Sequence, residues 1–341
     1  MNKTGGKAVR KIVLILFLVL SGLLTRAQDP QFSQFYAAPL YLSPSLAGAT
    51  SGSRVMINFR DQWPSIPGAF ITYSLAYDQY YPALNSGFGF LFTRDQAGTG
   101  RLGTTNMGFL YSYNIPVTKK WQIRPGLHFL RSQRTIDYSR LTFGDQLVNS
   151  ALVNSREYYY LDDRIAYMDF SASMIVFTEQ HWIGFTADHI IGPNQSLYNA
   201  YSEVPKKFSI YGGTKIVLRE SNGRFLDESI TPAFIYKSQL KYDQFDLGAY
   251  WTRTPIVVGF WYRGIPGFKK YKKGYQNNDA LVILAGYKVE NMSIGYSYDF
   301  TISRLVNNTG GSHELSIIYM FNQEQKSKRS RKKVIVPCPK F

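Results

Sequence analysis

The side chains that could perform catalysis or hold a metal are few and scattered along this 341-residue chain. The four histidines are His128, His181, His189 and His313, and only His181 and His189 lie near each other in the sequence. No cysteine or carboxylate cluster accompanies them at metal-ligand spacing. On a strand, His181 would share a face with Phe185, so we expect histidines at an interface or in a lumen rather than in a metal site.

Two further motifs are candidates for an enzyme's active site. GTGRLG at 98–103 resembles a phosphate-binding loop, but it lacks the Lys-Ser/Thr ending and a following helix, so a hairpin turn is favoured. Asp162 and Asp163 could pair as acid and base, but they and Glu157 lie in a long polar segment that favours solvated carboxylates. No nucleophile lies beside a base. The sequence therefore predicts no enzyme and no cofactor. A barrel enzyme that acts on lipids would need a nucleophile and a base at one rim, and the sequence does not supply such a pair.

The N-terminal 27 residues have the three parts of a secretory signal peptide. MNKTGGKAVRK is basic, IVLILFLVLSGLL is an apolar run that is short for a membrane span, and TRA gives a cleavage site after Ala27. A retained anchor is the alternative, but polar sequence follows at once. We therefore expect residues 1–27 to be removed and the mature chain to begin at Gln28, outside the cytoplasm.

The mature chain alternates between apolar and polar residues. MSIGYSYDF at 292–300 puts Met, Ile, Tyr, Tyr and Phe on one face of a strand and Ser, Gly, Ser and Asp on the other. The 26 Tyr, 23 Phe and 28 Gly also favour antiparallel strands. About 14 strands are expected, an even number as in single-chain bacterial barrels. Their ranges are 54–62, 68–79, 87–92, 107–113, 119–131, 164–178, 181–190, 206–219, 226–239, 246–252, 255–263, 279–290, 292–303 and 314–321.

The lengths of the connectors favour a membrane barrel over a soluble sandwich. Outer-membrane barrels keep long loops outside the cell and short turns in the periplasm. All the long connectors expected here are odd-numbered in chain order, namely 94–101, 132–163, 191–205, 264–278 and 304–312, although two odd ones near 63–67 and 240–242 are short. An open sheet edge in lipid would leave backbone groups unpaired, so the sheet must close. The fold expected for residues 53–322 is an all-β transmembrane antiparallel barrel, and a secreted two-sheet sandwich is the alternative.

Two segments fall outside the barrel pattern. Residues 28–52 are rich in aromatic residues and proline, and disordered segments are poor in aromatics. We expect this segment to pack against or into the periplasmic end of the barrel. Residues 323–341 form a basic tail in a chain of net charge +16.

The tail could bind anionic headgroups of outer-membrane lipid or an acidic patch on a periplasmic partner. VIVP at 334–337 could add to a partner's sheet edge. A periplasmic location argues against nucleic acid, and a solvated tail without a partner is the alternative. The lone cysteine cannot form an internal disulfide but could meet a partner thiol or a metal. The candidate partner-binding residues are Lys326, Lys328, Arg329, Arg331, Lys332, Lys333 and Cys338.

Three stretches carry a resemblance to a known family. QDPQFSQFYAAPLYLSPSLAG, then FRDQWPSIPGAFITYSLAYD, then GFGFLFTRDQAGTGRLGTTNMGFLYSYNI resemble the PorP/SprF family of outer-membrane proteins, which belong to type IX secretion and gliding machinery. The resemblance thins after about residue 135 and does not extend to the C-terminal VPCPKF. The motif residues are Gln28, Asp29, Pro30, Gln31, Phe32, Phe35, Arg60, Asp61 and Trp63.

Arg60, Asp61 and Trp63 are expected at the outer end of the first hairpin. There an Arg–Asp pair would fix loops or lumen and the Trp would anchor the membrane interface. Direct contact with a substrate is the alternative.

The resemblance implies an outer-membrane barrel that works with periplasmic ring components, with the translocon and with exported cell-surface adhesins. We therefore expect a non-enzymatic barrel with both termini in the periplasm. Its connectors 132–163, 191–205 and 264–278, or its lumen, would engage an adhesin, and its tail would dock on the ring. The alternative is a passive porin or solute transporter.

Overall fold

A computed structural model describes residues 29–50, 52–148, 155, 161–198, 200–219, 227–265, 277–303, 308–321 and 336–337. The chain divides into two compact units after Gln31, and the second unit, Phe32–Phe341, contains the whole sheet. The predicted signal peptide and the basic residues of the tail lie outside the described residues.

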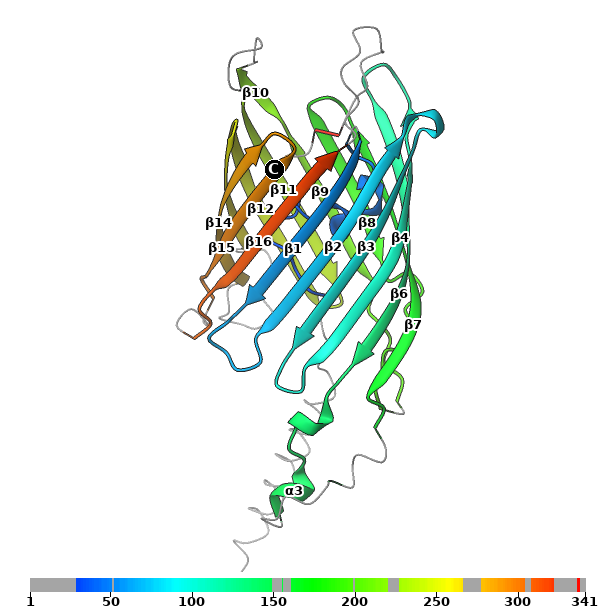
Figure 1. Cartoon of the computed structure of the whole chain (residues 1–341), viewed down its shortest axis with the longest axis vertical. Helices are drawn as coiled ribbons and strands as arrows, with labels where there is room; N and C mark the ends of the chain where they lie inside the picture. The colour runs from blue at the N-terminus through cyan, green and yellow to red at the C-terminus, as the bar shows by residue number, and fades with distance from the viewer. Residues whose placement is uncertain are drawn as a thin grey trace, which may run out of the picture. The chain divides into compact units, whose positions relative to one another are not determined.

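The strands form one closed antiparallel ring (Figure 1). β1 pairs with β2 and also with β16, which closes the ring. β9 and β10 both pair with β11 and share one position, and the two-residue β5 pairs only with β6, so the ring has 14 positions. The strands are β1 (Ser53–Gln62), β2 (Phe70–Tyr81), β3 (Ser86–Ala97), β4 (Leu102–Tyr113), β5 (Ile115–Pro116), β6 (Gln122–Thr135), β7 (Arg164–Phe177), β8 (His181–Asp188), β9 (Lys207–Thr214), β10 (Ile216–Arg219), β11 (Glu228–Gln239), β12 (Tyr242–Arg253), β13 (Ile256–Ile265), β14 (Asn277–Val289), β15 (Met292–Thr301) and β16 (Ser312–Phe321).

The predicted fold class is confirmed, and each expected strand range has a counterpart in the ring. The range 206–219 is divided at Lys215 into β9 and β10. One expected connector was wrong. β3 and β4 extend through most of 94–101 and pair as far as Ala97 and Leu102, so only a short turn at 98–101 remains. The pattern there was misread because polar residues such as Arg94 and Asp95 continue the strand beyond its apolar part.

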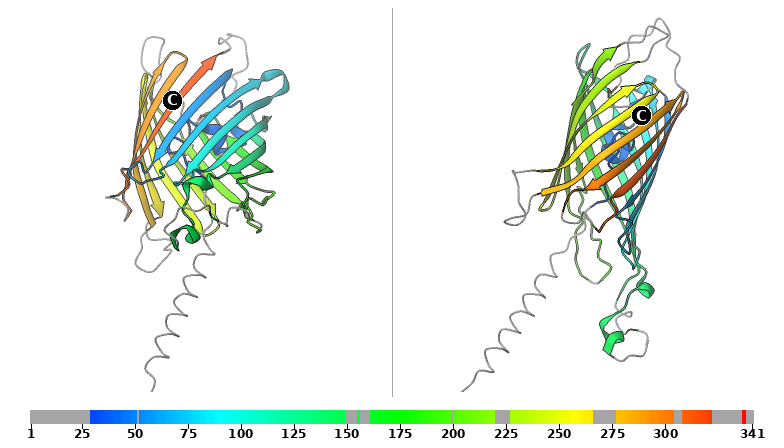
Figure 2. Two further views of the ribbon diagram at one scale, coloured as in Figure 1. Left: turned by 60° about the horizontal axis from the view of Figure 1, so that its bottom comes forward. Right: turned by 90° about the vertical axis from the view of Figure 1, so that its left-hand side faces the viewer.

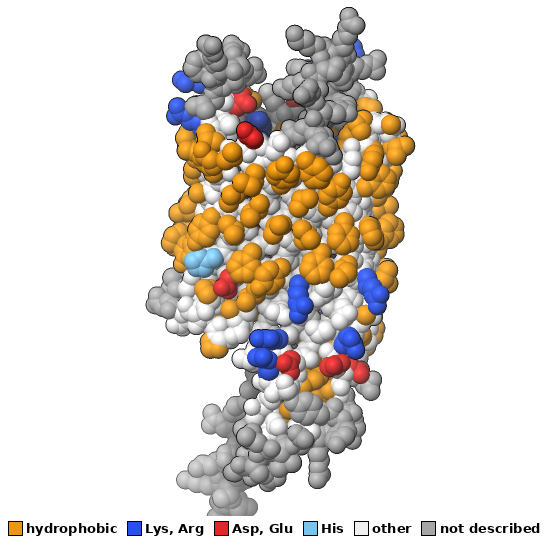
Figure 3. Space-filling model, viewed as in Figure 1, with side chains coloured by type: hydrophobic (Ala, Val, Ile, Leu, Met, Phe, Trp, Pro, Cys, Tyr) orange, Lys and Arg blue, Asp and Glu red, His pale blue; other side chains and the backbone are white. Residues whose placement is uncertain are grey.

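The two faces of the wall differ as the alternation predicts. On β15, Tyr296 is 46% exposed while Ser297 is fully buried. A band of hydrophobic side chains covers the wall in Figure 3, with charged side chains near its two ends. An apolar band flanked by polar ends is what a barrel presents to a lipid bilayer.

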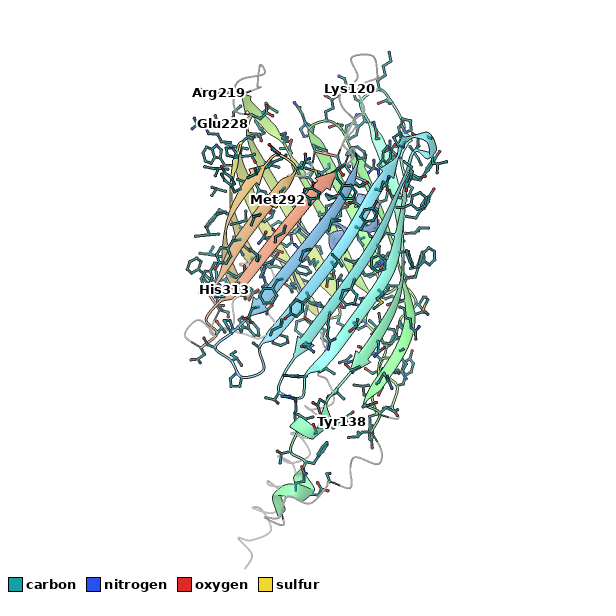
Figure 4. The ribbon with its side chains drawn as sticks, viewed as in Figure 1. Lys120, Tyr138, Arg219, Glu228, Met292 and His313 are labelled. Atoms are coloured by element: carbon teal, nitrogen blue, oxygen red, sulfur yellow. The ribbon has the colours of Figure 1, made fainter. Side chains whose placement is uncertain are left out.

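The connectors leave the ring at two mouths of different character. Connectors 136–163, 189–206, 266–276 and 302–311 share one end, which we call the long-loop mouth, with the turns at 63–69, 98–101 and 240–241. The opposite end, the short-turn mouth, carries 82–85, 114–121, 178–180, 220–227, 254–255 and 290–291. Lys120, Arg219 and Glu228 lie at the short-turn mouth in Figure 4, and Tyr138 lies beyond the other. The 220–227 connector is an exception to the expected shortness.

In the part of the chain that the structure describes, the helices are single turns. α2 (Pro39–Leu42) and the 3-10 turn η1 (Pro44–Leu46) precede β1, and η2 (Pro82–Leu84) follows β2. η3 (Tyr138–Arg140) and α3 (Gly144–Val148) lie at the long-loop mouth, and Figure 2 shows α3 on that side from two further directions. Within the described ranges, no helix has the length and apolar character needed to cross a membrane.

Candidate functional site in the lumen of the barrel

Residues 32–50, which we call the lumen segment, lie inside the ring. Their contacts reach strands on every side, from Asp78 of β2 through Ser112 of β4 and Ser173 of β7 to Trp261 of β13 and Glu314 of β16. A segment that touches all these inward faces can lie only within the ring, and Figure 1 shows it there in dark blue.

Tight turns make the lumen segment compact enough for this space. Pro39 and Pro44 each start a helical turn, which suits the fixed φ of proline. Gly48 has a φ of +61°, which favours glycine. The wall also makes room, because a Cβ on Gly87 of β3 would lie 2.2 Å from the carbonyl oxygen of Ala47. Segment and wall are therefore in backbone contact.

Aromatic side chains fill the middle of the lumen. The ring of Phe35 packs edge-on against Trp261 with centroids 5.1 Å apart. The ring of Tyr36 lies 6.0 Å from both Trp182 and Tyr250, again edge to face. All five side chains are buried. Such pairs add about 0.5–1.5 kcal/mol each beyond the burial of their area, so they hold the segment firmly.

A cluster of five buried charges lies near the long-loop mouth. Arg60 Nη2 is 2.8 Å from Asp299 Oδ2, and its Nη1 is 3.1 Å from Glu314 Oε2. Arg263 is 3.1 Å from both Asp299 Oδ2 and Asp246 Oδ1. We call Arg60, Asp246, Arg263, Asp299 and Glu314 the mouth cluster. Buried charges of this kind are stable only where every group has partners.

The lumen segment supplies further partners of the mouth cluster. The Ser33 hydroxyl accepts hydrogen bonds of 2.8 Å from Arg60 and from Arg263 and donates one of 2.7 Å to Asp299. The backbone N–H groups of Ser33 and Gln34 donate to the Glu314 carboxylate at 2.7 and 3.0 Å. The cluster therefore binds a stretch of backbone as well as pairing its own charges.

A second set of charges holds the other end of the lumen segment. Arg54 donates to both oxygens of Asp78, at 2.9 and 2.8 Å, and the Gly48 N–H donates to the same carboxylate at 2.7 Å. Arg124 donates to the Gly48 carbonyl at 3.2 Å, and its guanidinium lies 5.5 Å from the centroids of the Tyr80 and Phe177 rings. Both ends of the segment are thus fixed by buried ionic groups.

The histidines divide between the lumen and the outer wall. His189 Nδ1 is 2.6 Å from the buried Asp169 carboxylate. His181 is exposed and bonds Thr214, and His313 contacts the hydroxyl of Tyr296 at 2.8 Å. Among the residues that the structure describes, no group of three His, Cys, Asp or Glu side chains could hold a metal ion.

The long connectors contact each other at the long-loop mouth. Leu161 and Tyr198 form an isolated antiparallel bridge, and the Asp162 N–H donates to the Leu197 carbonyl at 3.1 Å. Nearby, the Ser139 hydroxyl and then the Arg140 guanidinium bond the Asp137 carboxyl and lower its pKa. Connectors 136–163 and 189–206 are therefore joined at Leu161–Asp162 and Leu197–Tyr198. Asp162 and Asp163 are exposed there, Glu157 lies outside the described residues, and the turn expected at GTGRLG is present.

The predicted motif residues are found in different roles. Arg60 does not pair with Asp61. Neighbours on a strand point to opposite faces, so Arg60 points inward to the mouth cluster while Asp61 lies on the other face beside His313. Trp63 packs edge-on against Phe70, with centroids 5.7 Å apart, in the turn after β1.

The remaining motif residues precede β1. Phe32 is buried against Tyr41 with centroids 5.1 Å apart. Asp29, Pro30 and Gln31 are half-buried, and Gln28 lies outside the described residues.

Only two residues of the tail are described, and both are buried. Val336 is 2% exposed and belongs to the same hydrophobic core as Phe35 and Trp261. The VIVP segment is therefore not wholly free to join a partner's sheet, because its β-branched Val336 is buried in its own barrel. The seven predicted tail contacts, Lys326, Lys328, Arg329, Arg331, Lys332, Lys333 and Cys338, lie outside the described residues.

Most residues of the site were not predicted from the sequence. Ser33, Gln34, Asp246, Arg263 and Glu314 were not singled out. A signal existed, because a charged residue on the inward face of a strand needs a partner within the lumen.

Comparisons with known proteins give a family and several solved barrels. The family model described as "Type IX secretion system membrane protein PorP/SprF" matches residues 24–319. No curated protein matches the chain.

Three of the similar solved structures each match at least 80% of this chain. The Ralstonia pickettii toluene transporter TbuX has a TM-score of 0.48 and 11% identity and covers 84% of this chain and 94% of its own. The P. putida toluene transporter TodX has a TM-score of 0.45 and 8% identity, with 83% and 93% covered. Acinetobacter baumannii Omp33 has a TM-score of 0.44 and 8% identity, with 80% and 100% covered.

Proposed function

The chain belongs to the PorP/SprF family of type IX secretion system membrane proteins, and we propose that it assists the export or surface attachment of a partner adhesin. It is an outer-membrane β-barrel, and we assign it no catalysis. In this proposal the short-turn mouth and the basic tail face the periplasm and dock on ring components. The joined connectors 136–163 and 189–206 face outward and contact the adhesin.

One observation carries the choice of an assembly component over a channel: a packed segment, residues 32–50, occupies the lumen. Buried aromatic rings occupy its middle, and ionic groups fix the lumen segment near both mouths. A pore for solutes needs a continuous water-filled path, whereas a barrel whose lumen holds a packed segment suits a docking role.

Affinity purification from the native outer membrane tests the proposal. The tagged barrel should co-elute with ring components and with an exported adhesin, and deletion of its gene should leave that adhesin off the cell surface. Normal surface display of every type IX adhesin in the deletion strain would refute the proposal.

A tail variant tests docking on the ring. Truncation after Phe321 would also remove the buried Val336, so neutralising the charges is the sharper change. We expect the variant with Gln at Lys326, Lys328, Arg329, Arg331, Lys332 and Lys333 to fold normally and to lose most ring association. The matched control is Lys119→Gln with Lys120→Gln, which removes exposed charges from the short-turn mouth. Equal recovery of ring components with the tail variant would exclude the tail as the docking element.

The second candidate function is a passive porin or solute transporter. Purified wild-type protein in planar bilayers decides between the two, because steady open pores would favour the porin. We expect no steady conductance from the wild type. Replacement of residues 32–50 by a Gly-Ser linker should open a pore.

A further inference from the structure

We propose that the chain enters the lumen at the long-loop mouth and crosses it to the short-turn mouth before β1 begins, so that its mature start belongs to the surface that binds the exported partner. The crossing itself does not depend on the proposed function. The assignment of the long-loop mouth to the cell surface rests on the proposed function.

The N-terminal end of the lumen segment lies at the level where the strands end at the long-loop mouth. The side chains of Ser33 and Gln34 form hydrogen bonds with the mouth cluster and with its neighbours Ser297 and Ser316. Every member of that cluster lies close to the long-loop end of its strand. Arg60 is near the end of β1, Arg263 near the end of β13 and Asp299 near the end of β15, while Asp246 and Glu314 are near the starts of β12 and β16.

The C-terminal end of the lumen segment lies at the level where the strands end at the short-turn mouth. Gly48 contacts Asp78 near the end of β2 and Arg124 near the start of β6. The Ala47 carbonyl accepts a hydrogen bond of 2.8 Å from Ser112, the last residue but one of β4. All three strands have these ends at the short-turn mouth, where β1 also starts at Ser53.

The length of the lumen segment permits this crossing. An extended chain spans about 3.3–3.6 Å per residue, so the stretch from Ser33 to Gly48 could reach about 50 Å. The turns α2 and η1 shorten it, but the apolar band of a barrel is only about 25 Å tall. The intermediate contacts follow in order, with Leu42 bonded to Thr186 and Ser45 bonded to Ser173.

The crossing separates the start of the lumen segment from the end of the last strand. β16 ends at Phe321 at the short-turn mouth, whereas Phe32 enters from the long-loop mouth. This proposal departs from the expectation that both termini face the periplasm, because it places the start of the mature chain at the long-loop mouth. A partner at the long-loop mouth would meet the start of the chain together with the connectors, and a pull on that start would act directly on the buried mouth cluster.

Labelling of single cysteines tests at which mouth the start of the mature chain lies. In a Cys338→Ser background, one variant carries Gly-Ser-Cys-Gly-Ser inserted between Gln28 and Asp29. Tyr201→Cys reports the long-loop mouth, and Asn291→Cys reports the short-turn mouth; both positions are exposed. Each is labelled with a membrane-impermeant maleimide in intact and in permeabilised cells, and heat-modifiable migration on gels verifies that each barrel is folded.

We expect the inserted cysteine and Tyr201→Cys to label in intact cells and Asn291→Cys to label only after permeabilisation. An inserted cysteine that behaves like Asn291→Cys overturns the crossing, whichever mouth is outside. If the inserted cysteine and Tyr201→Cys both require permeabilisation while Asn291→Cys does not, the crossing stands, but the surface assignment and the orientation in the proposed function fail. An epitope tag at the same insertion point, detected by antibody, provides a second measurement.

Discussion

Replacement of Arg60 by methionine should loosen the lumen segment without opening the wall. Methionine keeps much of the side-chain volume but removes the ion pairs with Asp299 and Glu314 and the hydrogen bond to Ser33. Removing one partner of a buried ion pair costs about 3–5 kcal/mol. Asp299 keeps Arg263 at 3.1 Å, so we take the lower value, about 3 kcal/mol.

Hydrogen exchange measures this cost directly. The N–H groups of Ser33 and Gln34 are bonded to Glu314 and exchange only when the segment opens locally. Since each 1.4 kcal/mol is a factor of ten, about 3 kcal/mol should raise exchange in the peptide around residues 32–42 roughly 100-fold. Peptides from the wall strands should change little.

A matched arginine substitution distinguishes the effect of breaking the mouth cluster from the effect of removing one positive charge. Arg140 pairs with Asp137 in an exposed loop, at 2.9 Å, and exposed pairs contribute about 0–1 kcal/mol. Arg140→Met should therefore leave exchange in residues 32–42 unchanged. The reasoning about the mouth cluster is refuted if folded Arg60→Met exchanges there within about threefold of the wild type, a difference below 1 kcal/mol.

Two further substitutions test the inner and outer faces of the wall. Gly87→Ala puts a Cβ 2.2 Å from the Ala47 carbonyl oxygen and should lower the free energy of unfolding in urea by about 1–3 kcal/mol. The control Gly144→Ala has nothing within 4 Å of its Cβ and should not lower it. Equal urea midpoints for the two variants would contradict the backbone contact. Phe109→Lys replaces an outward side chain, 71% exposed, in the middle of β4 and should cost about 2–4 kcal/mol in lipid vesicles. Tyr201→Lys, in a connector, should cost less than about 0.5 kcal/mol, and a similarly small loss for Phe109→Lys would argue against lipid on that face.

The wall could be predicted from the sequence because its signal is local. Tyr296 and Ser297 face opposite ways for the same reason that any two neighbours on a strand do, and that period repeats through all 14 positions of the ring. The expectation at 94–101 was wrong because polar side chains continue a strand beyond the apolar band.

The lumen could not be predicted in the same way, because its contacts join residues far apart in the chain. Arg60 meets residues that are 239 and 254 positions away, and no spacing rule connects them. The sequence reasoning therefore paired Arg60 with its neighbour Asp61. The aromatic content of residues 28–52 indicated packing, but nothing in it indicated which strands would be touched.

Ring closure between β1 and β16 has a consequence for how the protein is assembled. The first and last strands of the ring are neighbours in the wall, so the ring cannot close before the last strand has been synthesised. The lumen segment precedes β1 directly and carries bulky rings that pack on several strands. We expect the hairpins to assemble around the lumen segment and the β1–β16 pair to form last.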